Sequence, residues 1–368
     1  MGTATGRITV LIPAHDEERD IAAAIGSVRA QTRPVDRIVV IADNCADGTA
    51  AAAAASGAEV VTTTGNRHRK AGALNQVLDG LLGGARDDDL VLVMDADSHL
   101  DPGFVTAALA LLTGPGGGAY GGVGGTFRGR PVSDPALRRA GLGRWVESVQ
   151  CNEYARYARD VHRKRGRVLV LTGTATLFRI TALRAVVAAR RAGRLPAAPG
   201  AAHVYDTAVL TEDNELTLAL LHLGWRVRSP DGCTLTTEVM PTWRTLYRQR
   251  LRWKRGALEN LRQYGLTRIT AKYWGYQLAT LAGIVVTACY LASLVLAAAA
   301  THDVRLHAVW LVVTGIFVAE RVVTVRRRGW RWALMAALLL PEMVFDVFLQ
   351  ATHAKALLDT LTRRAAAW

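Results

Sequence analysis

Two patterns of hydrophobic positions divide the chain near residue 240. Before that point, stretches with apolar residues at helical spacing alternate with short apolar runs, which lie at 8–13, 37–42, 59–62 and 90–94. Runs that are apolar along their whole length are typical of parallel strands covered by helices on both faces. We therefore predict an α/β domain with a mostly parallel sheet over residues 1–240.

A stretch without charged side chains, 273–300, begins the second pattern. About 20 helical residues cross a bilayer, so this stretch is long enough to do so. Further apolar segments follow at 306–325 and 332–352, and the arginines between them predict a cytoplasmic connection. Residues 273–368 are therefore expected to form a membrane domain with three transmembrane segments, in a multi-pass plasma membrane protein with a cytoplasmic N-terminal domain.

Charged residues interrupt the second and third of these segments, and they are Glu320, Arg321, Glu342 and Asp346. A charge at the centre of a membrane helix costs about 2.5–3.5 kcal/mol on insertion scales. These side chains are therefore expected to pair, to face a wet cavity or to lie near the interface. Pro341 also breaks the third segment, so a re-entrant or partly interfacial course for it stays open.

A basic segment, 241–272, connects the two parts. Its residues from 244 onward hold nine basic side chains against one acid, Glu259, with leucines and aromatic residues interleaved near helical spacing. This pattern predicts an amphipathic helix on an anionic membrane surface. The same charge could bind nucleic acid, but the uncharged stretch that follows favours the membrane, so no nucleic-acid partner is expected.

Composition narrows the class of protein further. Half of the 368 residues are hydrophobic, which excludes an intrinsically disordered chain although the formal net charge is +14. The four cysteines are far apart and lack the spacing of a zinc site. No apolar run resembling a signal peptide occurs at the start, so the first domain is expected to stay in the cytoplasm.

Polar residues follow three of the predicted strands, and a parallel sheet binds its ligand at these strand ends. They are His15, Asp16 and Glu17, then Asp43 and Asn44, then Asp95 and Asp97. Two carboxylates one residue apart favour Mg²⁺ or Mn²⁺ bound together with substrate phosphates. Lys70 precedes another predicted helix, and a cation beside a helix N-terminus suits a diphosphate. Residues 43–49 also have the composition of a simple turn and helix cap.

Six motifs occur together in an order and at spacings that resemble glycosyltransferase family 2. They are ITVLIPAHDEE at 8–18, DNCADGT at 43–49, KAGALN at 70–75, DAD at 95–97, TED at 211–213 and QRLRW at 249–253. More narrowly, the chain looks like the membrane-bound branch with poly-N-acetylglucosamine, chitin-oligosaccharide, hyaluronan and cellulose synthases. The resemblance implies a GT-A fold and inverting transfer of a sugar from a UDP-sugar, with Mn²⁺ or Mg²⁺ as cofactor.

The resemblance also implies which residues bind the donor. Asp43 and the backbone near Ala14 would bind the uracil edge, and Glu17 would contact the nucleotide. Lys70 would lie near the phosphates. Asp95 and Asp97 would contact the ribose and hold the metal ion on the diphosphate.

On the acceptor side, the resemblance implies that Asp213 is the general base. Gln249, Arg252 and Trp253 would close over the diphosphate and donor sugar, and the Trp253 ring would form the floor of the acceptor subsite. The acceptor would lie beside Gly173, Thr174 and Glu212. TED also fits a helix start and Trp253 fits a membrane-interface anchor, so both simpler interpretations stay open.

Donor and acceptor identity are less defined. Gln150, Glu153 and Tyr154 resemble the N-acetylglucosaminyl branch, so N-acetylglucosamine or glucose is the expected sugar. The polymer-secreting relatives have membrane segments before the catalytic domain, whereas this chain starts with the catalytic strand. Several copies would therefore assemble, or the product would be short, and the acceptor would be a glycan, a lipid-linked molecule or a protein.

Three alternatives remain. One is a nonprocessive polyprenyl-phosphate or protein glycosyltransferase, which would not need QxxRW. Another is a non-catalytic membrane binding protein, against which the joint presence of Asp95, Asp97, Asp213, Arg252 and Trp253 argues. A nucleic-acid binder is the most remote.

Overall fold

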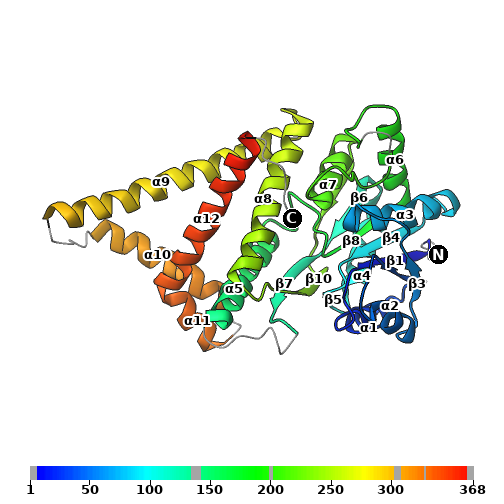
Figure 1. The fold of residues 1–368 in the computed structure, drawn as a ribbon, viewed down its shortest axis with the longest axis horizontal. Helices are drawn as coiled ribbons and strands as arrows, with labels where there is room; N and C mark the ends of the chain where they lie inside the picture. Colours follow the sequence, from blue (N-terminus) through cyan, green and yellow to red (C-terminus); the bar gives the residue numbers. More distant parts are fainter. Residues whose placement is uncertain (1–5, 134–141, 199–201, 302–307, 327–328, 363–368) are drawn as a thin grey trace.

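The computed structural model describes residues 6–133, 142–198, 202–301, 308–326 and 329–362 (Figure 1). Its centre is a seven-stranded sheet in the order β3-β2-β1-β4-β8-β6-β9. Strands β1 to β4 are parallel, β8 runs antiparallel between β4 and β6, and β9 is parallel to β6. The bounds are Ile8–Ala14 for β1, Arg37–Ala42 for β2, Glu59–Thr62 for β3, Leu90–Met94 for β4, Tyr120–Gly124 for β6, Ala175–Arg179 for β8 and Arg226–Arg228 for β9.

Helices cover both faces of this sheet, as the uniformly apolar strands predict. On β1, Val10 and Ile12 pack toward α1, α2 and α4, whereas Leu11 packs toward α3, α6 and α7. Alternation along a strand sends successive side chains to opposite faces, so both faces must be apolar. These helices are Ile21–Arg29, Thr49–Ala55 and Phe104–Thr113 on one face, and Arg69–Gly84, Ile180–Arg191 and Glu212–His222 on the other.

A second, three-stranded sheet lies beside the carboxyl end of β4 and was not predicted. Its order is β5-β10-β7, with β10 antiparallel to β5 and parallel to β7. The bounds are Ser98–Leu100 for β5, Thr234–Glu238 for β10 and Thr126–Arg130 for β7. Polar residues dominate β10, so it lacks the apolar pattern by which the other strands were recognised.

Long helices form the other half of the molecule. Helix α8 lies between the sheet domain and α12 (Figure 1). Helix α5 packs against both α8 and α12. Helices α9 and α10 project away from the sheets (Figure 1). The bounds are Leu142–Arg163 for α5, Trp243–Tyr264 for α8, Ala271–Thr301 for α9, Ala308–Val325 for α10, Trp330–Ala337 for α11 and Leu339–Leu361 for α12.

The predicted amphipathic segment forms α8, but its apolar face is not exposed. Leu246 packs against residues of α5 and α12, and Leu261 packs against residues of α7 and α9. Two of its basic side chains, Arg250 and Arg255, are buried in ion pairs. The expectation that this apolar face lies on a membrane is therefore wrong, because neighbouring helices cover it.

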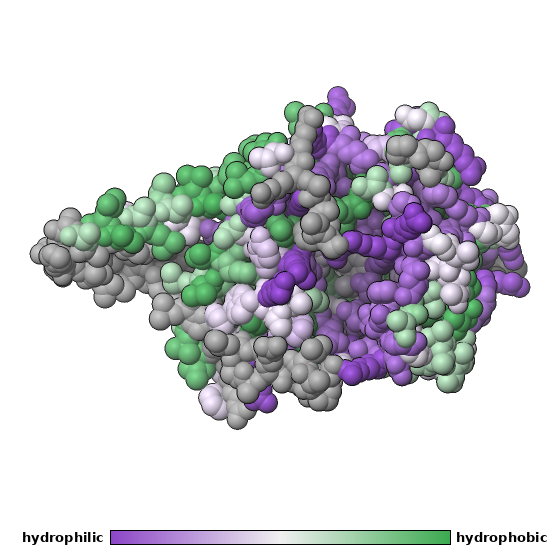
Figure 2. Space-filling view, in the orientation of Figure 1, coloured by the Kyte–Doolittle hydropathy of each residue, from purple (hydrophilic) through white to green (hydrophobic). Residues whose placement is uncertain are grey.

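Among the described residues, one helix is long and apolar enough to cross a membrane, and it spans Ala271–Ser293. It covers most of the predicted first segment. Hydrophobic side chains gather over this projecting part of the molecule, whereas the sheet domain is largely hydrophilic (Figure 2). Leu278 and Val286 on α9 are 64% and 67% exposed.

The predicted third segment, 332–352, is not one continuous helix. The chain breaks at Leu338, between α11 and α12, and one face of α12 packs on α8. Glu342 is fully buried and accepts hydrogen bonds from Arg156 at 2.7 Å and Arg321 at 3.3 Å. Arg321 also pairs with Asp346. The expectation that these interrupting charges pair is confirmed for Arg321, Glu342 and Asp346.

Candidate active site

The carboxyl end of β2 places Asp43 in a fixed polar pocket. Its carboxylate Oδ1 accepts hydrogen bonds from Thr63 Oγ1 and Asn66 Nδ2, both at 2.8 Å. Asp43 is 7% exposed, and its carbonyl lies 2.6 Å from the Nδ1 of His15. Thr63 and Asn66 were not predicted, although they follow the strand run 59–62 as the other rim residues follow theirs.

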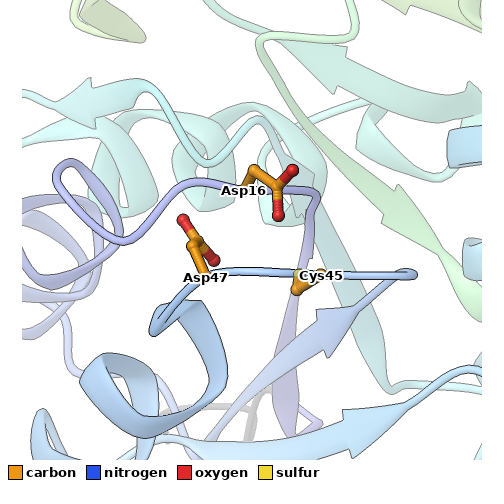
Figure 3. Close-up of side chains that lie close together, drawn as sticks. All are labelled: Asp16, Cys45 and Asp47. Atoms are coloured by element: carbon orange, nitrogen blue, oxygen red, sulfur yellow. The ribbon is translucent and has the colours of Figure 1, made fainter.

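The loops after β1 and β2 are tied together by an exposed cluster of Asp16, Cys45 and Asp47 (Figure 3). Asp16 accepts a hydrogen bond from the Ala46 N–H at 2.7 Å, and Asp47 accepts one from the Thr49 N–H at 3.0 Å. These carboxylates therefore hold loop backbone, which confirms the turn at 43–49, whereas the N-cap residue of α2, Gly48, has no side-chain cap.

Acidic side chains crowd the carboxyl end of β4. Burial raises the pKa of Asp97 to about 7, and the neighbouring Asp95 adds to this shift. Burial also raises the pKa of Glu17 to about 8, with Asp97 as the next cause. Carboxylates that repel one another at one rim, with oxygen atoms as donors, have the chemistry that Mg²⁺ and Mn²⁺ prefer. The residues present therefore fit a divalent cation.

The second sheet completes this acidic rim with residues that were not predicted. Arg130, at the end of β7, donates to Asp20 at 2.6 Å and lies 3.5 Å from Glu238 at the end of β10. Its guanidinium also donates to the Asp97 carbonyl at 3.1 Å. One cation thus anchors the rim, and its position depends on a pairing of strands distant in the sequence.

Lys70 links the two groups of predicted site residues. Its Nζ donates to the carboxylate of Asp95 and, at 3.1 Å, to the carbonyl of Gly173, and it lies 3.7 Å from Glu212. Burial alone would lower the pKa of Lys70, but Asp95 and Glu212 outweigh it and raise the pKa. Lys70 is therefore a permanent cation between the carboxylates.

Asp213 lies directly beside this lysine. Its Oδ2 accepts the Gly173 N–H at 2.9 Å, and its Oδ1 accepts the Asn214 N–H at 2.8 Å. Burial raises the pKa of Asp213 to about 6, Glu212 adds to the shift, and Lys70 opposes it. TED opens α7 as the helix-start interpretation predicts, but the Asp213 side chain also reaches the loop that holds Gly173.

A small cavity adjoins these groups and includes an unpredicted residue, Tyr205. Lys70, Gly173, Glu212 and Asp213 line it as well. The side-chain amide of Asn75, in the KAGALN motif, donates to the Tyr205 carbonyl at 2.8 Å and accepts the Tyr205 N–H at 3.0 Å. Tyr205 lies outside the motifs and the predicted strands, so no local pattern marks it. Thr174 contributes its carbonyl, which accepts the Asp95 N–H at 3.1 Å.

Helix α8 brings QRLRW against the start of α7. Arg252 donates to the Leu210 carbonyl at 3.3 Å, and Asn260 donates to the Thr211 carbonyl at 3.1 Å. Trp253 is half-buried, with the guanidinium carbon of Arg250 4.4 Å from its ring centre. The Oε1 atom of Gln249 is buried and finds no hydrogen-bond partner among the described residues.

The arrangement is that of a nucleotide-sugar-binding GT-A domain, with an acidic rim at the strand ends and a lysine and a half-buried carboxylate beside it. The family model described as glycosyltransferase like family 2 matches residues 6–256, more than half of the chain. The chain therefore belongs to glycosyltransferase family 2 and is a transferase, as predicted.

The chain is also similar to two known proteins. The probable glycosyltransferase YdaM of Bacillus subtilis (strain 168) is 26% identical over 278 residues, which are 73% of this chain and 58% of that protein. The chain thus spans less than two thirds of the length of this curated relative. The structure of the mannosyltransferase PcManGT from Pyrobaculum calidifontis in complex with GDP-Man and Mn²⁺ superposes with a TM-score of 0.60 at 20% identity, covering 99% of this chain and 89% of that one. The GT-A fold is thereby confirmed.

Proposed function

We propose that the protein is an inverting, metal-dependent, membrane-bound glycosyltransferase. It transfers N-acetylglucosamine or glucose from a UDP-sugar to a hydroxyl of a glycan or lipid-linked acceptor. The observation that carries this proposal is the half-buried Asp213 carboxylate, which accepts the Gly173 N–H, while the Gly173 carbonyl accepts a hydrogen bond from Lys70, the partner of Asp95 in the acidic rim.

The donor end is assigned to the rim. Asp43 and the backbone near Ala14 bind the uracil edge, and Glu17 faces the nucleotide. The carboxylates of Asp95 and Asp97 would hold Mn²⁺ or Mg²⁺. A bound divalent cation neutralises charge that develops on the leaving diphosphate. The GDP-Man and Mn²⁺ in the PcManGT structure support a nucleotide-sugar donor and a divalent cation for this fold.

The chemistry follows from the charges around the reacting carbon. The acceptor oxygen bonds to the sugar C1 as the bond from C1 to the diphosphate breaks, and the electron pair of that bond leaves with UDP. Asp213 takes the acceptor proton. Displacement from the opposite face converts an α-linked donor into a β-linked product. Lys70 and Arg252 stabilise negative charge on the donor side.

The acceptor end is assigned to the α7, α8 and Gly173 side of the site. Gly173, Thr174 and Glu212 flank the acceptor, Gln249 and Arg252 close over the donor, and Trp253 offers an aromatic face to a sugar.

Membrane attachment is proposed from the outer surface of the helical half. Four apolar side chains on α12 are 39–58% exposed, namely Met343, Val344, Val347 and Leu358. The opposite, buried face of this helix is partly polar. An apolar exterior over a partly polar interior suits contact with lipid. With the uncharged stretch 273–300 of α9 beside it, the molecule is a membrane protein whose sheet domain lies in the cytoplasm.

UDP release tests the proposal. The detergent-solubilised protein is given Mn²⁺ and a panel of UDP-sugars, with and without membrane lipid extract or chito-oligosaccharides, and products are weighed by mass spectrometry. A ladder of masses identifies a chain-extending enzyme, and one added sugar identifies a single-step transferase. No UDP release with any donor and acceptor would contradict the proposed activity.

A further inference from the structure

Helix α5 carries three residues on one face that contact QRLRW or the segment leading into it. Gln150, Glu153 and Tyr154 are spaced as i, i+3 and i+4, so they share a helix face. The side-chain amide of the fully buried Gln150 donates to the Met240 carbonyl at 2.9 Å and accepts the Met240 N–H at 3.0 Å. It thereby fixes the backbone just before α8 begins.

One turn further along α5, Glu153 holds Arg250 of α8. The Oε2 atom of Glu153 accepts a hydrogen bond from the Nη2 of Arg250 at 2.6 Å, and Arg250 is only 3% exposed. The Arg250 guanidinium carbon lies 4.4 Å from the ring centre of Trp253 and 5.4 Å from that of Tyr154. A single buried cation thus contacts two aromatic rings and one carboxylate.

This arrangement fixes the orientation of Trp253. An indole on a helix can occupy more than one rotamer, whereas an aromatic platform for a sugar must hold one plane. A planar guanidinium that is itself anchored by a carboxylate selects the rotamer that stacks on it. Trp253 remains half-buried, so part of its surface stays accessible.

We propose that Gln150, Glu153 and Tyr154 form a mount on α5 that sets the plane of Trp253 through Arg250. Arg250 is then a positioning residue for the acceptor sugar, and Glu153 acts through it. The inference rests on the proposed function only in its assignment of Trp253 to the acceptor subsite.

The orientation of Trp253 can be measured without an acceptor. The full chain, labelled with 5-fluorotryptophan, is studied by ¹⁹F NMR in detergent, and the signal lost in Trp253→Phe identifies Trp253 among the nine tryptophans. Glu153→Gln and Arg250→Met are expected to shift or broaden this signal. Arg250→Lys keeps the charge but not the planar stack, so it should restore the signal only in part.

A matched control separates positioning from general stability. Arg190 and Glu215 form another buried pair with the same 2.6 Å separation, between α6 and α7. Arg190→Met should lower the melting temperature but leave the Trp253 signal unmoved. An unmoved Trp253 signal in Glu153→Gln and in Arg250→Lys, both folded by melting temperature, would overturn the proposal.

Kinetics test the consequence for the acceptor. With the chito-oligosaccharide or membrane lipid extract that supports UDP release, Arg250→Lys and Glu153→Gln should raise the half-saturating acceptor concentration about tenfold, as for a desolvated cation–π contact. The half-saturating donor concentration should change less than twofold. In a Trp253→Ala background the effect of Glu153→Gln should vanish, and full additivity would overturn the mount.

The outcomes distinguish the mount from the proposed function. If the unchanged chain releases no UDP, the proposed function fails while the NMR result still decides the mount. If Trp253→Ala leaves acceptor saturation unchanged, the acceptor assignment fails and the positioning role fails with it.

Discussion

Asp213 owes its chemistry to neighbours that lie far from it in the sequence. The Gly173 N–H donates to its carboxylate, and Lys70 donates to the Gly173 carbonyl. Burial and the charge of Glu212 favour the neutral acid, whereas Lys70 favours the carboxylate, and the pKa of Asp213 is raised to about 6. Such a carboxylate is ionised at neutral pH yet basic enough to accept a proton.

Exchange of Asp213 for asparagine is expected to abolish sugar transfer. Removing a general base costs about 10²–10⁴-fold in rate, whereas the nucleotide contacts proposed for Asp43 should stay intact. UDP release and UDP binding by calorimetry measure the two effects separately.

Asp97→Asn is the contrasting variant, since it should weaken Mn²⁺-dependent UDP binding instead. Normal turnover by Asp213→Asn would show that Asp213 is not the general base.

The rate should depend on pH through the same carboxyl group. Only the ionised carboxylate can accept the acceptor proton, so turnover should increase as the pH rises through about 6 and level off above it. In Lys70→Met the opposing cation is lost, and the midpoint should move to higher pH.

Lys164→Met is the control for this shift, because Lys164 pairs with Asp160 at an exposed site. An unchanged midpoint in Lys70→Met would show that Lys70 does not tune the base.

At the scale of elements, the site depends on how closely α8 approaches the start of α7. Gly256 faces Thr211, and a Cβ at this position would overlap the Thr211 side chain. One turn later, Asn260 is fully buried and donates to both oxygens of Thr211 at 3.1 Å. The missing side chain of Gly256 therefore lets QRLRW lie against TED.

Gly256→Ala should separate these helices. Overpacking of this kind costs about 1–3 kcal/mol, so the melting temperature should fall by several degrees and turnover should fall with it.

Gly80→Ala is the matched control, because a Cβ there meets nothing within 4 Å. It should raise stability by about 0.5–1 kcal/mol, as alanine favours a helix over glycine. Equal melting temperatures for the two variants would contradict a close approach at Gly256.

At the scale of the whole molecule, polarity is divided between two halves. The sheet domain is hydrophilic outside, whereas exposed apolar side chains cover α9 and the outer face of α12 (Figure 2). Arg268, just before α9, and Lys272, in its first turn, are both exposed. Basic residues next to an apolar helix favour an anionic lipid surface.

Membrane attachment should therefore resist conditions that release peripheral proteins. After alkaline carbonate or high salt, the full chain is expected to stay with vesicles in a flotation gradient, because α9 contributes apolar burial and not only charge. Release at high salt would show that the protein is attached by electrostatic attraction alone. Exchange of both Arg268 and Lys272 for glutamine should weaken initial binding to anionic vesicles without releasing protein already inserted.

The sequence by itself determined the parts that depend on local pattern. The strands β1 to β4 lie at the predicted ranges within one residue, because strands buried on both faces must be apolar throughout. The rim acids were found because the ends of parallel strands carry their own signal, whereas the TED and QRLRW motifs were found through the resemblance to glycosyltransferase family 2.

Tertiary structure decided what depends on contacts between distant segments. Lys70 lies between Asp95 and Glu212, and Tyr205 joins the site through Asn75, contacts that no local pattern encodes. The apolar face of α8 looked like a membrane surface, yet α5 and α12 cover it. Periodicity shows that a helix face will be buried, but only packing decides whether protein or lipid buries it.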